Sequence, residues 1–106
     1  MSAKIAVIDD EPQLRRMLRI ALKSSGYEAF DADCAAAGLE LIVLQQPDLV
    51  LLDLGLPDMD GLQLLAELRS WSQVPVIVLS VRNSFSEKGK ALDTGAQDYV
   101  TKPFSI

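Results

Sequence analysis

The sequence contains no histidine and one cysteine among its 106 residues. Without histidine, the chain cannot build a Ser-His or Cys-His nucleophile pair, or a His-ligated metal site, from its own residues. The single cysteine, Cys34, permits no disulfide within the chain, which fits a reducing compartment. Any chemistry that these residues carry out must therefore use carboxylates, hydroxyls, lysine or a hard cation.

Long apolar runs are also missing. Runs such as residues 50–52 and 76–79 are too short, and too often interrupted by charge, to span a bilayer. The N-terminal segment MSAKIAVIDDEP becomes acidic after a short apolar stretch and lacks a small-residue cleavage site, so it does not resemble a signal peptide. We therefore expect a cytoplasmic protein with no membrane partner, and a single domain over residues 1–106.

Positive charge is in deficit. The sequence contains ten Lys and Arg residues and fifteen Asp and Glu residues, which gives a net charge of −5 and a pI near 4.5. An acidic surface argues against direct binding of this segment to a nucleic-acid backbone. It suits a cation or a basic partner surface instead.

Short apolar strands alternate with helical patterns along the chain. The predicted strands are residues 4–8, 27–32, 48–53, 75–80 and 97–101, and the predicted helices are residues 12–23, 35–45, 61–70 and 84–93. Such alternation predicts an α/β fold with a parallel sheet covered by helices on both faces. Only Ser105 and Ile106 follow Phe104, so a closing helix is missing, and we expect a chain truncated before its final helix.

Polar side chains close four of the predicted strands. The first strand ends at Asp9 and Asp10, the third at Asp53, the fourth at Ser80, and Lys102 follows the fifth. A charge that closes a buried apolar run such as LVLLD is costly unless something compensates it. Ligands of open parallel sheets bind outside the carboxyl ends of the strands, and a doubly wound sheet of order 2-1-3-4-5 brings these residues together.

The residue types at this edge favour a magnesium and phosphoryl site. Three converging carboxylates repel one another unless a divalent cation joins them, and Mg²⁺ prefers oxygen ligands. The backbone carbonyl of Gly55 is well placed to complete the set. Ser80 and Lys102 could contact phosphoryl oxygens, and Asp53 would then be a nucleophile that forms an acyl phosphate.

Plainer interpretations remain for each residue taken alone. The acids after the first strand suit a helix N-terminus, Ser80 suits a strand end, and Lys102 suits a solvated surface. Asp33 can cap the helix that follows it. The stretch DMDG at residues 58–61 resembles parts of a calcium-binding EF loop and of haloacid-dehalogenase phosphatases, but Leu56 cannot be the first calcium ligand. We therefore interpret Asp58 and Asp60 as turn acids before a helix.

Several segments together resemble the receiver domain of bacterial two-component response regulators. They cover nearly the whole chain and are VIDDEP, LVLLDLGLPDMDGLQLL, PVIVLS and GAQDYVTKPF. The resemblance implies a flavodoxin-like or CheY-like fold. Within the family, the run LRSWSQVPVIVLS and the LDLGLPD turn most resemble the OmpR/PhoB-type regulator of the potassium-transport (Kdp) operon.

This resemblance implies a role for each residue at the predicted site. Asp53 would accept a phosphoryl group from a sensor histidine kinase. Asp9 and Asp10 would hold Mg²⁺, with Asp10 as the direct ligand, and the Gly55 carbonyl would be the backbone ligand. The chain would be a phosphoacceptor rather than an enzyme, with at most slow self-dephosphorylation.

The resemblance also implies a switch and an output. Ser80 would move to the phosphoryl oxygen, and Tyr99 would turn inward behind it. Lys102 would contact the phosphoryl group, and its bond to Pro103 would be cis. Phosphorylation would then bias the fourth helix and its flanking loops, and control transcription through a DNA-binding domain that this chain lacks.

Three positions depart from the family pattern. Val81 is bulkier than the usual residue and could narrow access to the phosphoacceptor. Gly89 and Gln97 replace an apolar and an acidic residue on the surface of the fourth helix and fifth strand, through which such regulators form homodimers. A small magnesium-dependent phosphohydrolase and a phosphorylation-independent interaction module remain as alternative functions.

Overall fold

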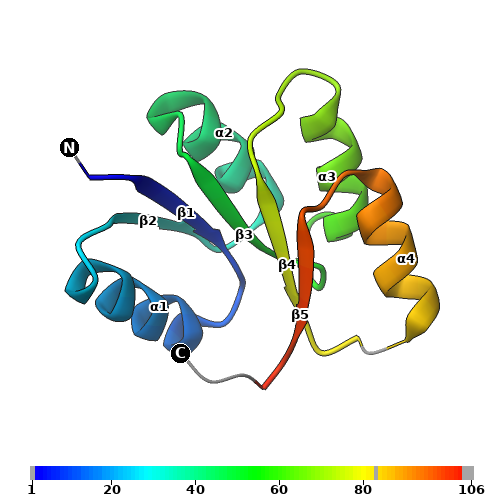
Figure 1. Cartoon of the computed structure of the whole chain (residues 1–106), viewed down its shortest axis with the longest axis horizontal. Coiled ribbons are helices and arrows are strands. Elements are labelled where there is room, and N and C mark those ends of the chain that lie inside the picture. Colours follow the sequence, from blue (N-terminus) through cyan, green and yellow to red (C-terminus); the bar gives the residue numbers. More distant parts are fainter. Residues whose placement is uncertain (1, 83, 104–106) are drawn as a thin grey trace.

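A five-stranded parallel sheet forms the centre of the protein. The computed structural model describes residues 2–82 and 84–103. The strands are β1 (Lys4–Ile8), β2 (Glu28–Ala32), β3 (Leu49–Asp53), β4 (Val76–Ser80) and β5 (Asp98–Thr101). Their order across the sheet is β2-β1-β3-β4-β5 (Figure 1). This confirms the predicted doubly wound α/β fold.

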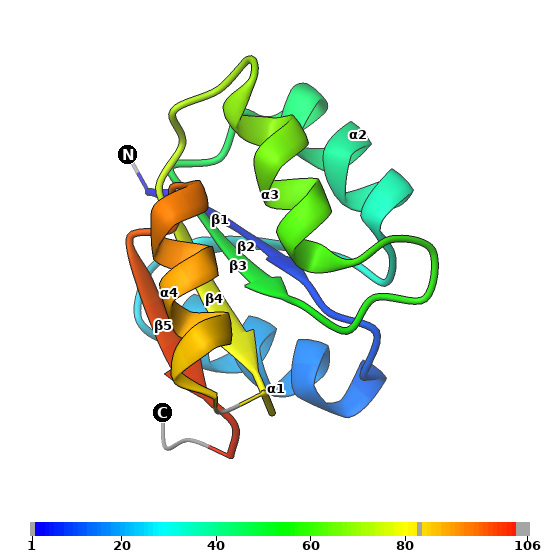
Figure 2. The same ribbon diagram turned by 90° about the vertical axis from the view of Figure 1, so that its right-hand side faces the viewer.

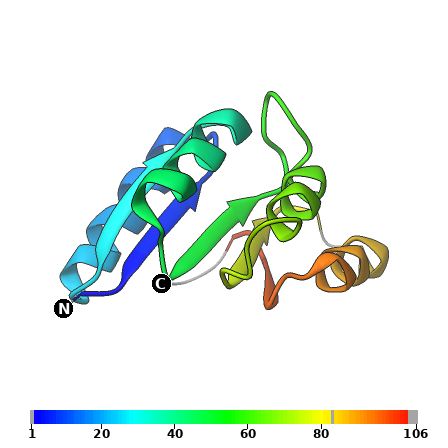
Figure 3. The ribbon, with the colours of Figure 1, turned by 90° about the horizontal axis from the view of Figure 1, so that it is seen from above.

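Helices cover both faces of the sheet. In the described residues they are α1 (Pro12–Ser24), α2 (Ala35–Gln45), α3 (Gly61–Arg69) and α4 (Phe85–Thr94). Seen from above, α2 lies in front of β1 and β2 and α1 lies behind them (Figure 3). Seen from the right-hand side of Figure 1, α4 lies beside β5 and next to α3 (Figure 2). Right-handed crossovers place successive helices in this way.

Alternate residues of β1, β3, β4 and β5 contribute to two separate hydrophobic cores. Ala6 and Ile8 join the larger core, under α2, α3 and α4, whereas Val7 packs with Leu18 of α1 in the smaller one. Val50 and Leu52 of β3 are fully buried. Burial on both faces explains why the central strands read as continuous apolar runs.

The β3–α3 loop lies close against the start of α3. A Cβ atom at Gly61 would stand 2.5 Å from the Cα atom of Leu54, so only glycine fits there. The amide of Gly61 also donates to the carbonyl of Leu54 at 2.8 Å. This close approach fixes the loop that follows Asp53.

The helix caps differ from the prediction in one place. Asp60, predicted to be a turn acid before a helix, caps α3: its side chain accepts a hydrogen bond from the amide of Leu62. Asp33 is wrong as a cap: the N-cap position of α2 is Cys34, which makes no side-chain cap bond. Asp58 takes that role from the β3–α3 loop, since its carboxylate accepts from the amides of Ala35 and Ala36.

Two predictions about the ends of the chain have different outcomes. The Lys102–Pro103 peptide bond is cis, as expected. Phe104, Ser105 and Ile106, on which the expected truncation rests, lie outside the described residues. In residues 2–82 and 84–103, no helix combines the length and apolar character needed to cross a bilayer.

Candidate functional site

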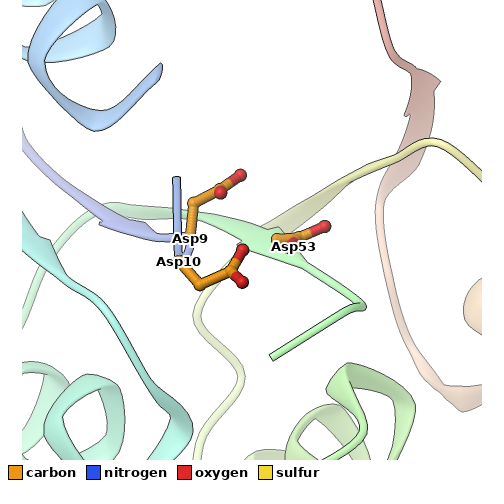
Figure 4. Close-up of side chains that lie close together, drawn as sticks. All are labelled: Asp9, Asp10 and Asp53. Carbon is orange, nitrogen blue, oxygen red and sulfur yellow. The ribbon is translucent and has the colours of Figure 1, made fainter. Parts of the chain in front are cut away.

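Three carboxylates meet at the carboxyl edge of the sheet. Asp53 is the last residue of β3, and Asp9 and Asp10 follow β1, the neighbouring strand. Because Ile8 pairs with Leu52, Asp9 and Asp53 each come one residue later on adjacent strands. Figure 4 shows the three side chains together, and each offers an oxygen within 4.8 Å of the others.

Burial distinguishes the three carboxylates. Asp9 is fully buried and Asp53 is 6% exposed, whereas Asp10 lies on the surface. Asp9 is held by neighbours: its Oδ1 accepts from the amide of Glu11 at 2.9 Å, and its backbone carbonyl accepts from the Arg15 guanidinium at 2.8 Å. The cluster therefore has a rigid inner side and a solvent-facing side.

Lys102 supplies the positive charge of the cluster. Its Nζ atom lies 2.8 Å from Asp9 Oδ2, 3.1 Å from Glu11 Oε1 and 3.5 Å from Asp53 Oδ1. Burial disfavours its ammonium form, but the hydrogen bonds to Asp9 and Glu11 outweigh this effect and raise the pKa of Lys102. Glu11, which the sequence marked only as an acid before a helix, is thus a second partner of this lysine.

The environment of Asp53 disfavours its charge. Burial, followed by repulsion from Asp9, raises the pKa of the Asp53 carboxyl above its ordinary value. The Lys102 ammonium and a hydrogen bond from the Gly55 amide act in the opposite direction without cancelling it. A cation bound beside these carboxylates would remove that repulsion.

A small hollow gives access to Asp53. Its volume is 260 Å³, and it is lined by residues from the ends of β1, β3, β4 and β5: Asp10, Glu11, Asp53, Gly55, Ser80, Val81, Arg82 and Lys102. Ser80 is 1% exposed, and its hydroxyl accepts a hydrogen bond from the Arg82 amide at 3.1 Å. Val81 is 72% exposed and so stands at the rim.

Two predicted site residues do not line this hollow: Asp9, which is fully buried beneath it, and Tyr99. Tyr99 packs against the larger core, and its hydroxyl donates to the backbone carbonyl of Arg82 at 2.7 Å. Arg82 thus connects Tyr99 with Ser80. Arg82 was not among the predicted site residues; the only signal in the sequence is a basic side chain two residues after the end of β4.

The donor set fits a hard divalent cation. Carboxylate oxygens from three residues, with solvent access on the Asp10 side, are the ligands that Mg²⁺ prefers, because it keeps several waters. Gly55 lines the same hollow, and its carbonyl remains the predicted backbone ligand. Among residues 2–82 and 84–103, this is the one cluster of three or more such side chains.

Residues 5–106 match the family model of the response regulator receiver domain, and the chain belongs to that family. It is 53% identical to the transcriptional regulatory protein KdpE of Mycobacterium tuberculosis and 49% identical to that of Escherichia coli, over 96% of this chain in each case. The chain spans 45% of the length of each relative.

Solved structures agree with this assignment. The receiver domain of a Francisella response regulator has a TM-score of 0.93 at 32% identity, covering 98% of this chain and 87% of the other. The BeF3-activated receiver domain of RstA from Klebsiella pneumoniae has a TM-score of 0.92 at 30% identity, covering 96% and 87%. The predicted family and fold are thereby confirmed.

Proposed function

We propose that Asp53 accepts a phosphoryl group from a phosphohistidine of a sensor kinase. The observation that carries this proposal is the placement of Asp53: a nearly buried carboxylate at the end of a central strand, with Lys102 and two further carboxylates beside it. The hollow in front of it admits a small group. A carboxylate held in this way can act as a nucleophile toward the phosphorus atom of a negatively charged phosphoryl group.

The transfer balances without any further reactant. An oxygen of Asp53 forms a bond to phosphorus while the bond from phosphorus to the donor nitrogen breaks. The electron pair of that bond stays on the imidazole nitrogen, which takes up a proton from solvent water. Lys102 balances charge on the phosphoryl oxygens, and the Ser80 hydroxyl turns from the Arg82 amide to donate to one of them.

Asp9, Asp10, Asp53 and the Gly55 carbonyl would hold Mg²⁺ for this reaction. When bound, the ion would offset the repulsion among the carboxylates and the charge of the phosphoryl group. The fixed position of Asp9, with its bonds to Glu11 and Lys102, keeps these oxygens preorganised. Exposed Asp10 gives the ion and its waters a route to solvent.

The output would be a rearrangement of α4 and its flanking loops. Movement of Ser80 leaves the Arg82 amide free, and Tyr99 then loses its fixed acceptor. By similarity to the KdpE relatives, which are transcriptional regulatory proteins, the chain would take part in transcription regulation. Action in the cytoplasm and DNA binding through a further domain stay predictions. A homodimer through α4 and β5 stays a prediction.

The module would be a phosphoacceptor and not a turnover enzyme. Of the acids that line the hollow, Asp10 and Asp53 would hold the cation and Glu11 pairs with Lys102, which leaves no general base to activate water. Slow self-dephosphorylation is therefore the most we expect. Sustained turnover of phosphate esters would instead support the phosphohydrolase alternative.

Intact-protein mass spectrometry after acetyl phosphate treatment tests the proposal. We expect the mass of one phosphoryl group to be added with Mg²⁺ and little without it, and Asp53→Asn to abolish the addition. Asp48→Asn, at the opposite edge of the sheet, is a matched control that should leave labelling unchanged. Among the described residues, the Asp48 carboxylate accepts a hydrogen bond only from the Lys4 amide. Equal labelling of wild type and Asp53→Asn would overturn the assignment of the acceptor.

A further inference from the structure

Arg82 joins the starts of two neighbouring helices, α3 and α4. Its Nη2 atom lies 3.0 Å from Asp60 Oδ2, and its Nη1 atom lies 3.4 Å from Glu87 Oε2. Asp60 caps α3, and Glu87 lies in the first turn of α4. One guanidinium therefore holds the start of α4 to the start of α3.

The backbone of the same residue contacts two side chains that the proposed function sets in motion. The Arg82 amide donates to Ser80 Oγ at 3.1 Å, and its carbonyl accepts from the Tyr99 hydroxyl at 2.7 Å. The position of Arg82 consequently fixes the acceptor of Tyr99 and the donor to Ser80. A side chain that anchors Arg82 also anchors these two bonds.

We propose that the ion pairs of Arg82 with Asp60 and Glu87 form an electrostatic latch that holds the unphosphorylated arrangement of Tyr99 and α4. This inference rests on the proposed function in taking Ser80 and Tyr99 as the moving parts. Arg82 is a positioning residue: it acts on Tyr99 through its own backbone, whose place its side chain determines. Release of the latch would shift the equilibrium toward the arrangement that phosphorylation favours.

The three side chains of the latch are partly exposed to solvent, so its ion pairs can break at low cost. The side chains of Arg82, Asp60 and Glu87 are 34%, 45% and 27% exposed. Ion pairs that are partly exposed contribute little to stability individually, so both pairs together should change a two-state equilibrium by about two- to tenfold. That is enough to bias a switch without fixing it. Opposite charges nearby raise the pKa of Arg82, chiefly through its hydrogen bond to Asp60, so the guanidinium stays charged.

The decisive variant removes the partners and keeps Arg82. Asp60→Asn/Glu87→Gln breaks both ion pairs but leaves the guanidinium at the hollow. Asparagine caps a helix about as well as aspartate, so α3 keeps its cap. The control, Glu40→Gln/Asp93→Asn, removes the same charge from two exposed residues that form no ion pair in the described part of the chain.

Fluorine NMR of protein labelled with 3-fluorotyrosine reports the switch directly. The chain has two tyrosines, and Tyr27, on the far side of the sheet beside β2, is an internal reference. Without any phosphoryl group, the Tyr99 signal of the double variant should move toward its position in wild type treated with Mg²⁺ and beryllofluoride. The population of that state should rise about two- to tenfold, and Arg82→Gln should act in the same direction.

Each outcome decides between the two proposals. A Tyr99 signal in the double variant that matches wild type and the control overturns the latch, even if Asp53 is labelled normally. A displaced signal in the double variant alone supports the latch. If the signal moves in the variant while acetyl phosphate labels no residue in wild type, the latch stands and the phosphoacceptor proposal fails.

Discussion

Asp58 illustrates how much a single residue depends on contacts that are distant in sequence. Its two carboxylate oxygens accept from the amides of Ala35 and Ala36, at 2.7 and 3.0 Å. A neighbouring acid, Asp33, lies much closer in sequence to that helix but does not cap it. The β3–α3 loop is thereby tied to α2 as well as to α3.

This cap makes a prediction about pH. The amides of Ala36 and Ala35 lower the pKa of Asp58 below 3.8, its value in the absence of the fold. Because the folded-state pKa is lower than the unfolded one, Asp58 stabilises the fold above about pH 4, and this contribution disappears as the pH falls through the folded-state pKa. Asp58→Ala should therefore be less stable than wild type at neutral pH, and the difference should shrink in acid.

Urea denaturation from about pH 7 down to about pH 3 measures this difference. Asp33→Ala is the matched control, since Asp33 is exposed and makes no hydrogen bond in the described part of the chain. It should keep the wild-type midpoint at every pH. A constant difference between Asp58→Ala and wild type across the range would contradict the charged cap.

At the site, sequence reasoning located residues whose position depends on the sheet. Asp9, Asp53 and Ser80 end apolar strands, and the parallel topology then requires them to meet. The contacts of Glu11 and Arg82 were not predictable, because they depend on the paths of loops and on the conformations of long, flexible side chains. No periodicity in the sequence encodes such contacts.

Among the elements, α4 is built with a weak point. Gly89 lies in the middle of the helix, and a Cβ atom there would have no neighbour within 4 Å. Glycine in a helix interior costs about 0.5–1 kcal/mol relative to alanine, because it loses more backbone entropy on folding. Gly89 therefore lowers the free-energy cost of unfolding the helix that the proposed switch rearranges.

Gly89→Ala should stabilise the protein by about 0.5–1 kcal/mol, because the methyl group meets open space. Thermal unfolding measures this as a rise in Tm of several degrees. Gly38→Ala is the contrasting control: its Cβ atom would stand 2.6 Å from Ile8 Cδ1, so we expect a loss of about 1–3 kcal/mol. A lower Tm for Gly89→Ala would mean that α4 packs against another surface in solution.

Strand and helix positions were predictable nearly to the residue. β3 begins at Leu49 and not at Asp48, because the Asp48 carboxylate bonds to the Lys4 amide at the strand's entrance. α4 begins at Phe85 because Ser84 serves as its cap, accepting from the Glu87 amide. Such end effects depend on local hydrogen bonds that apolar patterns do not record.

For the whole molecule, the carboxylate cluster links ion binding to stability. The folded chain brings three carboxylates within reach of one cation, and the unfolded chain does not. A ligand that binds only the folded state stabilises it by mass action, by about 2.7 kcal/mol at one hundred times its Kd. Mg²⁺ at that concentration should raise the Tm by about 10 °C.

Differential scanning calorimetry with increasing MgCl₂ tests this effect. Asp10→Asn removes an exposed carboxylate of the cluster and should abolish most of the rise, whereas NaCl at equal ionic strength should not reproduce it. A Tm independent of Mg²⁺ would contradict the proposed ion site.

The sheet order that brings the site residues together was predictable because crossover connections between parallel strands are almost always right-handed.

The place of Asp53 within β3 has a consequence for how such a molecule evolves. Asp53 is paired with Leu79 of β4 and is therefore part of the rigid sheet, whereas Arg82 and Glu87 lie in the loop and helix beyond it. The proposed phosphoacceptor thus lies in the sheet, whereas the residues proposed to respond to it lie in a loop and a helix outside the sheet. Substitutions in the responding part can retune the strength of a signal while the receiving part, and the fold that depends on it, stays intact.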